Sequence, residues 1–219
     1  MSADFSIIFD LDGTLVDSSL GILGSLAEAF KSAKVKPIHP LDSSLIGPPL
    51  RETITYLAPG LTRPKVDQII SAFKCHYDHI GYRETKPFAG VCAALYLLKS
   101  QGVEMHIATN KRTVPTRLIL AYLGWSGLFN SVYSSDSIQS ISPTKAELLS
   151  SQLMCEGLSS DCTYYIGDRL DDWYSASANG VRFVWAQWGY SSSYLEFSDN
   201  SLILHSPDLL QSLPGIACS

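Results

Sequence analysis

The chain has 219 residues, of which 46% are hydrophobic, and a formal net charge of −5 at pH 7. A chain of this length can bury a sizeable core and form one domain plus a smaller second one. The acidic balance argues against binding to a nucleic-acid backbone, and the apolar runs are too short to span a bilayer.

The start of the chain and the cysteines bear on the cellular compartment. Residues 1–4, Met-Ser-Ala-Asp, lack the basic segment and the long apolar core of a secretory signal. The five cysteines are scattered and never spaced Cys-x-x-Cys, which argues against a disulfide framework or a zinc site. We therefore expect a cytoplasmic protein that binds neither nucleic acid nor membranes, and the sequence leaves the oligomeric state open.

The first predicted element is a short buried strand over residues 5–9, Phe-Ser-Ile-Ile-Phe, because β-branched and aromatic runs favour a pleated surface. Asp10 and Asp12 follow it, and Gly13 allows the backbone to turn sharply. Ligands of open α/β sheets bind at the carboxyl ends of the strands, so the two aspartates are candidate site residues. An isolated Asp-x-Asp is, however, more commonly a turn. Two carboxylates this close stay ionised only when they share a cation.

A helical pattern follows from about residue 17 to 86. Apolar residues recur at helical spacing over 20–30 and 66–80, and prolines separate the two stretches. The pattern predicts a small helical domain over 17–86, inserted into a core domain formed by 1–16 and 87–219. Arg51, after the Pro48-Pro49 turn, is a candidate for reading the far end of a substrate, and a solvated arginine is an equal alternative.

The rest of the chain alternates strands and helices. Strands are predicted over 103–108, 131–133, 163–166 and 181–185, with a short last one over 202–204. Helices are predicted around 91–98 and 114–123, from Ser142-Pro143 onward with Ser142 as N-cap, and from Pro207 onward. Such alternation implies an α/β fold with a doubly wound, Rossmann-like parallel sheet.

Polar groups lie at the ends of these predicted strands or at the starts of helices. Thr109 and Asn110 end one strand, Lys145 lies just inside a helix whose N-terminus favours anions, and Asp168 and Asp172 flank the start of another helix. Each feature alone is weak, because turns, solvated lysines and helix-dipole pairing also explain it. Their shared position at strand ends indicates a common site.

These segments, taken in order, resemble a known signature. Asp-Leu-Asp-Gly-Thr-Leu-Val-Asp over 10–17, then Thr109, then Lys145, then Gly-Asp-Arg-Leu-Asp-Asp over 167–172 is similar to the four motifs of the haloacid dehalogenase (HAD) superfamily. Segments 47–52 and 188–190 are further similar to its phosphoglycolate phosphatase-like branch, which includes nucleotidases and pyrophosphatases. The insert at 17–86 sits where members with a helical C1 cap carry it. Asp171 receives no role.

The resemblance implies an enzyme, a Mg²⁺-dependent phosphatase that hydrolyses a small phosphorylated metabolite such as phosphoglycolate. Asp10 would be the nucleophile that forms an aspartyl-phosphate, and Asp12 the acid that protonates the leaving alcohol. Asp10, the Asp12 main-chain carbonyl and Asp168 would hold Mg²⁺, and Asp172 would hold metal-bound water or orient Lys145.

The phosphate oxygens would be bound by Thr109, Lys145 and the backbone amides of Leu11 and Asn110. Lys111 and Arg112, which follow Asn110, could add positive potential at the mouth of the site, but a surface role is expected.

Other functions remain open. Within the superfamily these are a 5'-nucleotidase or pyrophosphatase, and then a phosphomutase, which would share the core residues. From a different class, a phospho-aspartate signalling protein also uses acidic residues, a threonine and a lysine on a parallel sheet, although such a protein would be about half this length. An inactive binding protein is a further alternative.

Overall fold

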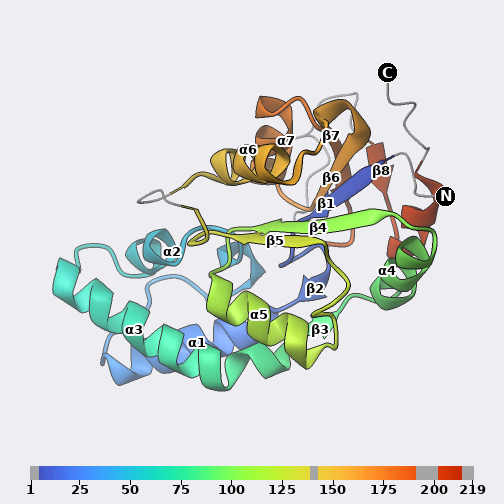
Figure 1. The fold of residues 1–219 in the computed structure, drawn as a ribbon. Coiled ribbons are helices and arrows are strands. Elements are labelled where there is room, and N and C mark those ends of the chain that lie inside the picture. Colours follow the sequence, from blue (N-terminus) through green and yellow to red (C-terminus); the bar gives the residue numbers. More distant parts are fainter. Residues whose placement is uncertain (1–4, 139–142, 191–201, 214–219) are drawn as a thin grey trace.

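The computed structural model of the chain describes residues 5–138, 143–190 and 202–213 (Figure 1). In this part of the chain a parallel sheet has the strand order β5-β4-β1-β6-β7-β8, which confirms the predicted α/β fold class. The short last strand is also present. The strands are β1 (Ser6–Phe9), β4 (Glu104–Thr109), β5 (Ser131–Ser134), β6 (Thr163–Gly167), β7 (Arg182–Ala186) and β8 (Leu202–Leu204).

Helices cover both faces of the sheet (Figure 1). Because side chains alternate along a strand, Ile7 and Phe9 of β1 join one buried cluster and Ile8 joins another. The first cluster includes residues of α4 (Val91–Ser100) and Leu120 of α5 (Thr113–Tyr122). The second includes Leu148 of α6 (Lys145–Glu156) and Ala176 of α7 (Leu170–Ala178).

A helical segment is inserted after β1 and has a hydrophobic core of its own, which contains Phe30, Ile54, Ile69 and Phe73. In it α1 packs along α3 (Figure 1). The sequence pattern indicated α1 and α3 but missed α2. The elements of the segment are α1 (Ser19–Ser32), η1 (Ser43–Leu45), α2 (Leu50–Leu57), α3 (Arg63–His79) and η2 (Gly81–Glu84).

A pair of short antiparallel strands, β2 (Val16–Asp17) and β3 (Lys86–Pro87), joins the helical segment to the rest of the chain. No pattern in the sequence predicts this pair, because two residues are too few to show a period. The two boundaries proposed from the sequence, 16/17 and 86/87, fall within these strands.

One helix start and one helix type differ from the sequence predictions. The helix expected from Ser142-Pro143 begins at Lys145, and its N-cap is Thr144, whose hydroxyl accepts a 3.2 Å hydrogen bond from the Glu147 amide. The Glu147 carboxylate accepts one of 2.8 Å from the Thr144 amide in return, which completes a capping box. Ser142 lies outside the described residues. The final helix is a 3₁₀ helix, η5 (Pro207–Ser212).

Two further observations bear on the compartment. Among the described residues, no helix combines the length and apolarity that crossing a bilayer requires. Cys75, Cys92 and Cys155 are free and exposed, whereas Cys162, the last residue of η3 (Ser160–Cys162), is disulfide-bonded. The cysteine spacing argues against a framework of several disulfides and does not predict this single bond, because spacing along the chain does not show which cysteines meet in space.

Candidate active site

Three carboxylates from distant parts of the sequence meet at the carboxyl edge of the sheet. Asp10 follows β1, Asp168 follows β6, and Asp172 lies in the first turn of α7. One carboxylate oxygen from each of the three residues lies within 4.8 Å of the other two, and all three residues are buried. Parallel neighbouring strands end at the same edge, which explains why residues more than 150 positions apart form one cluster.

Lys145 supplies a positive charge to this cluster. It is the first residue of α6, is buried, and donates a 2.7 Å hydrogen bond to Asp10 Oδ1. Its ammonium also pairs with Asp172 Oδ1 and lies 5.9 Å from the centroid of the Tyr165 ring. The Thr144 cap fixes where α6 begins and thereby directs Lys145 toward Asp10.

Burial and crowding shift the protonation of these groups. Burial raises the pKa of Asp10 well above its ordinary value; the Lys145 ammonium opposes this rise, and the Asp172 and Asp168 carboxylates add to it. Burial, with the Asp172 carboxylate, raises the pKa of Asp168 to about 7. Burial lowers the pKa of Lys145, but Asp10 and Asp172 outweigh this and raise it well above its usual range. The cluster therefore lacks positive charge.

Asp172 is held in place on several sides. Its Oδ2 accepts a 3.0 Å hydrogen bond from the Arg169 amide, and its Oδ1 accepts one of 3.1 Å from the Tyr165 hydroxyl. The hydroxyl of Tyr165 also lies 3.1 Å from the carbonyl oxygen of Ala108 in β4. A β-carbon at Gly167 would overlap the Asp172 side chain, so a glycine is required there.

Backbone groups closely surround the Asp168 carboxylate. Its Oδ2 accepts a 2.8 Å hydrogen bond from the Tyr190 amide, and Thr14 Oγ1 lies 3.4 Å from its Oδ1. Gly13 has φ +95°, and a β-carbon at Gly13 or at Gly189 would collide with the Asp168 carboxyl group. These two glycines therefore make room for the Asp168 side chain.

The carboxylate of Asp12 is bound by Ser18 and Lys111. Ser18 Oγ donates a 2.5 Å hydrogen bond to its Oδ1, and Lys111 Nζ lies 3.0 Å from Oδ1 and 2.8 Å from Oδ2. The Lys111 side chain is only 7% exposed, so the surface role expected for it is wrong. Its position directly after Thr109 and Asn110 was the one signal in the sequence, and only the fold shows that the side chain turns inward.

The strand-end pair Thr109 and Asn110 lies at the same edge. Thr109 is buried, and its Oγ1 accepts a 3.2 Å hydrogen bond from the Lys111 amide, which shapes the loop after β4. The Asn110 side-chain amide donates a 3.1 Å hydrogen bond to Asp171 Oδ2. Asp171, which received no role from the sequence, thus orients Asn110.

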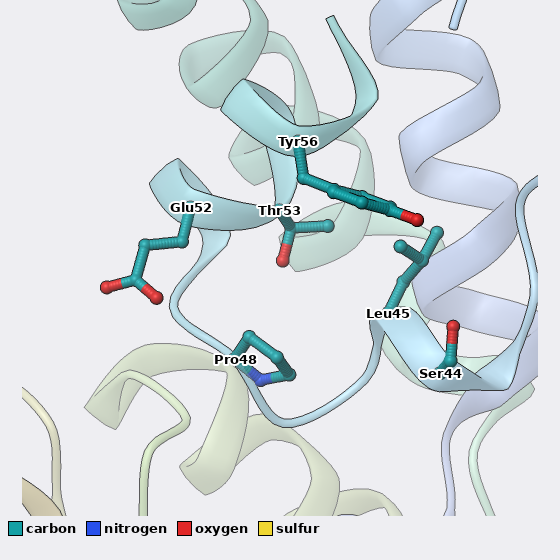
Figure 2. Close-up of a pocket in the computed structure, with 6 residues that line it drawn as sticks. All are labelled: Ser44, Leu45, Pro48, Glu52, Thr53 and Tyr56. Carbon is teal, nitrogen blue, oxygen red and sulfur yellow. The ribbon is translucent and has the colours of Figure 1, made fainter. Parts of the chain in front are cut away.

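Arg51 is not brought to this cluster. It lies on α2, is exposed, and pairs with Asp67 of α3 at 2.5 Å. A hollow of about 250 Å³ on the same segment also contains none of the predicted site residues. Figure 2 shows the Tyr56 ring extending toward Leu45 while Glu52 points away from both. The lining residues are Ser44, Leu45, Pro48, Glu52, Thr53 and Tyr56.

The carboxylate cluster fits a divalent metal ion. Its donor set consists of carboxylate oxygens, which are ligands that Mg²⁺ prefers. Three carboxylates face one ammonium, so the ionised cluster lacks two positive charges, which is the charge of one such ion. Gly13 and Gly189 leave room for the Asp168 side chain, which is how this carboxylate fits into the cluster.

Comparison with known proteins gives consistent results. The family model described as haloacid dehalogenase-like hydrolase matches residues 7–186. A phosphoglycolate phosphatase of Xylella fastidiosa is 31% identical over 191 residues, 85% of this chain and 82% of the relative. A 5'-nucleotidase of Pseudomonas aeruginosa is 30% identical over 190 residues, 85% of this chain and 84% of the relative. The solved structure of Protein Tyrosine Kinase A (PtkA) of Mycobacterium tuberculosis is 28% identical, with a TM-score of 0.79 over 97% of this chain and 98% of that one.

Proposed function

The chain belongs to the haloacid dehalogenase-like hydrolase family, and we propose that it is a phosphatase that hydrolyses a small phosphorylated metabolite. The family match and the phosphoglycolate phosphatase relative confirm the resemblance read from the motifs. The observation that carries the proposal is the convergence of Asp10, Lys145, Asp168 and Asp172 in one buried cluster.

Charge decides what the cluster can do. A phosphate dianion is repelled by the carboxylate of Asp10, and the repulsion is strong in a site that excludes water. Lys145, buried beside Asp10, offsets part of it. Mg²⁺ held by Asp10, Asp168 and the main-chain carbonyl of Asp12, with Asp172 beside them, would supply the remaining positive charge at the phosphate oxygens.

The residues divide the reaction into two displacements. An Asp10 oxygen forms a bond to phosphorus while the bond from phosphorus to the ester oxygen breaks, and Asp12 gives that oxygen a proton. In the second step Asp12 takes a proton from a water molecule whose oxygen attacks phosphorus. The bond to Asp10 then breaks, inorganic phosphate leaves, and both aspartates regain their starting state.

Other residues stabilise the charge that spreads over the phosphoryl oxygens. Lys145 remains beside Asp10, and the Thr109 hydroxyl with the backbone amides at Leu11 and Asn110 would donate hydrogen bonds to those oxygens. Asp171 contributes indirectly, because it holds the Asn110 side chain.

We further propose that the helical segment 17–86 acts as a cap domain on the core formed by 1–16 and 87–219. Two contacts support this arrangement. Arg112 pairs with Asp78 of α3 at 2.7 Å, and a β-carbon at Gly47 would come within 2.7 Å of Arg169 Cδ, so the segment reaches residues next to Asn110 and Asp168 at two separate places. A cap there excludes water and protects the aspartyl-phosphate. A substrate contact by Arg51 would require Arg51 to leave Asp67.

A 5'-nucleotidase is the second candidate, favoured by the relative of that name. It would use the same core residues and differ in the leaving group that the cap admits. The cytoplasmic location stays a prediction, and the disulfide at Cys162 does not favour it, because disulfides are rare in the reducing cytosol.

The test is phosphate release by the purified protein, with and without Mg²⁺, from p-nitrophenyl phosphate, phosphoglycolate and nucleoside monophosphates. ATP with a tyrosine peptide tests the activity that the mycobacterial relative's name indicates. We expect Mg²⁺-dependent hydrolysis that falls at least about a thousandfold in Asp10→Asn and is unchanged in Asp161→Asn, at an exposed position. No release from any ester, or full activity of Asp10→Asn, would contradict the proposal.

A further inference from the structure

Lys111 presents a buried cation next to the group that must protonate the leaving oxygen. Its ammonium binds both oxygens of the Asp12 carboxylate, at 3.0 and 2.8 Å. The two groups form an ion pair whose side chains are almost fully enclosed. The site therefore already contains a carboxylate-binding position, in which the Lys111 ammonium binds the carboxylate of Asp12.

The helical segment covers this carboxylate-binding position. The Lys111 ammonium lies 4.7 Å from the centroid of the Tyr77 ring, and Tyr77, on α3, is 1% exposed. The next residue, Arg112, is engaged by Asp78 of the same helix. Since the side chains of Lys111 and Asp12 are only 7% and 13% exposed, the enclosure favours a small group beside the ammonium.

Distance limits what Lys111 can contact. A general acid lies about 2.6–3.2 Å from the oxygen that it protonates. With Lys111 Nζ 2.8 Å from Asp12 Oδ2, the ammonium is within about 6 Å of the leaving oxygen. That is the reach of a carboxylate on the carbon next to the ester oxygen, as in the ester of a short 2-hydroxy acid.

On the basis of the proposed phosphatase function, we infer that Lys111 binds the carboxylate of the leaving group. This carboxylate replaces Asp12 beside the ammonium when substrate binds. The exchange keeps the buried ammonium paired and frees Asp12, which takes a proton from solvent and turns toward the ester oxygen as its acid. A substrate with a neutral leaving group offers no replacement partner, so freeing Asp12 leaves a buried charge unpaired, which is costly. Lys111 thus selects for an anionic leaving group.

The experiment compares 2-phosphoglycolate with ethyl phosphate, a two-carbon ester without the carboxylate, using p-nitrophenyl phosphate as a third substrate. The p-nitrophenolate group leaves with little help from an acid and reports whether the rest of the site is intact. The variant is Lys111→Met, which keeps the apolar stem, and the matched control is Lys31→Met, at an exposed helix position.

We expect the wild type to prefer 2-phosphoglycolate over ethyl phosphate by about a hundredfold or more in kcat/KM, since a site built to bind a group rejects the analogue that lacks it. Lys111→Met should lower this preference at least about tenfold, because it removes the ammonium that binds the carboxylate. Lys31→Met should behave as wild type. Glycolate should inhibit p-nitrophenyl phosphate hydrolysis by the wild type but not by Lys111→Met.

Two results would overturn the inference while the phosphatase function stands. The first is a wild type that hydrolyses p-nitrophenyl phosphate but shows no preference between the two-carbon esters, which needs no variant to fold. The second is an equal loss on both esters in Lys111→Met, which would mean that Lys111 only positions Asp12. A wild type inactive on all three esters would instead overturn the proposed function, and the inference with it.

Discussion

Lys145 Nζ donates a 2.7 Å hydrogen bond to Asp10 Oδ1 across 135 positions of the chain, and both side chains are buried. The same ammonium pairs with Asp172, and Asp168 lies in the same cluster. One cation therefore faces three carboxylates at the point where the strands end. This imbalance supports the metal requirement that we propose. Burial is the main cause of the raised pKa of Asp10, and the Asp172 and Asp168 carboxylates add to it.

Removing charge from the two members of this pair should have opposite effects on stability. Because the pKa of Asp10 is raised, its ionised form destabilises the folded state at neutral pH, and Asp10→Asn should increase the free energy of unfolding in chelator. Lys145→Met leaves the carboxylates without their cation and should lower it by about 3 kcal/mol. Urea unfolding at pH 7.5 with EDTA measures both, and changes of the same sign would contradict the description of the cluster.

Mg²⁺ should stabilise the protein through the carboxylate cluster. A ligand that binds only the folded state at a hundred times its Kd adds about 2.7 kcal/mol. We expect Mg²⁺ to raise the thermal unfolding midpoint of the wild type and of Asp161→Asn, and to leave that of Asp168→Asn unchanged. Equal shifts in all three proteins would place the bound ion elsewhere.

Buried His106 should make stability depend on pH. Its Nδ1 lies 2.8 Å from Ser131 Oγ in the sheet, and burial lowers its pKa below 6.5. As the pH falls below about 6.5, His106 binds a proton in the unfolded chain but not in the folded protein. The free energy of unfolding therefore decreases until the pH reaches the lower pKa of the folded state. The loss between pH 7.5 and 5.5 should be smaller in His106→Gln than in wild type. His79→Gln, at an exposed position, should keep the full loss, and identical pH profiles for all three proteins would refute the assignment.

The N-cap of α6 should matter for both stability and activity. Thr144→Ala removes the hydroxyl that accepts from the Glu147 amide and should cost about 1 kcal/mol. Because the cap directs Lys145 toward Asp10, the variant should also lower kcat. Ser142→Ala is the matched control, since the sequence pattern favours Ser142 as the cap; a larger loss in that variant would show that the capping box is misplaced.

Much of the fold and the polar residues of the site could be predicted from local signals. A short apolar strand that ends in Asp10 and Asp12, and the similar ends at Thr109 and Asp168, indicate a parallel sheet and an edge where polar groups gather. The parallel sheet is confirmed. The catalytic and metal-binding roles of these residues remain predictions for the experiments above.

What the sequence could not show depends on contacts between distant segments. Lys111 has the local appearance of a surface lysine and is buried because Tyr77, from the helical segment, covers it. The pair β2–β3 joins residues about 70 positions apart, and each strand is too short to have a period. Ser142 and Thr144 are equally good caps by composition, and Glu147, three residues after Thr144, was the signal that distinguishes them.

The most direct test of the central claim is to find the phosphoryl group on the protein itself. The protein is mixed with substrate and Mg²⁺, quenched in acid during turnover and digested, and the peptides are analysed by mass spectrometry. We predict a phosphorylated peptide that contains Asp10, whose label is released by hydroxylamine as expected for an acyl phosphate, and no label in Asp10→Asn. A label on another residue, or turnover with no labelled peptide under conditions that trap a known aspartyl-phosphate, would contradict it.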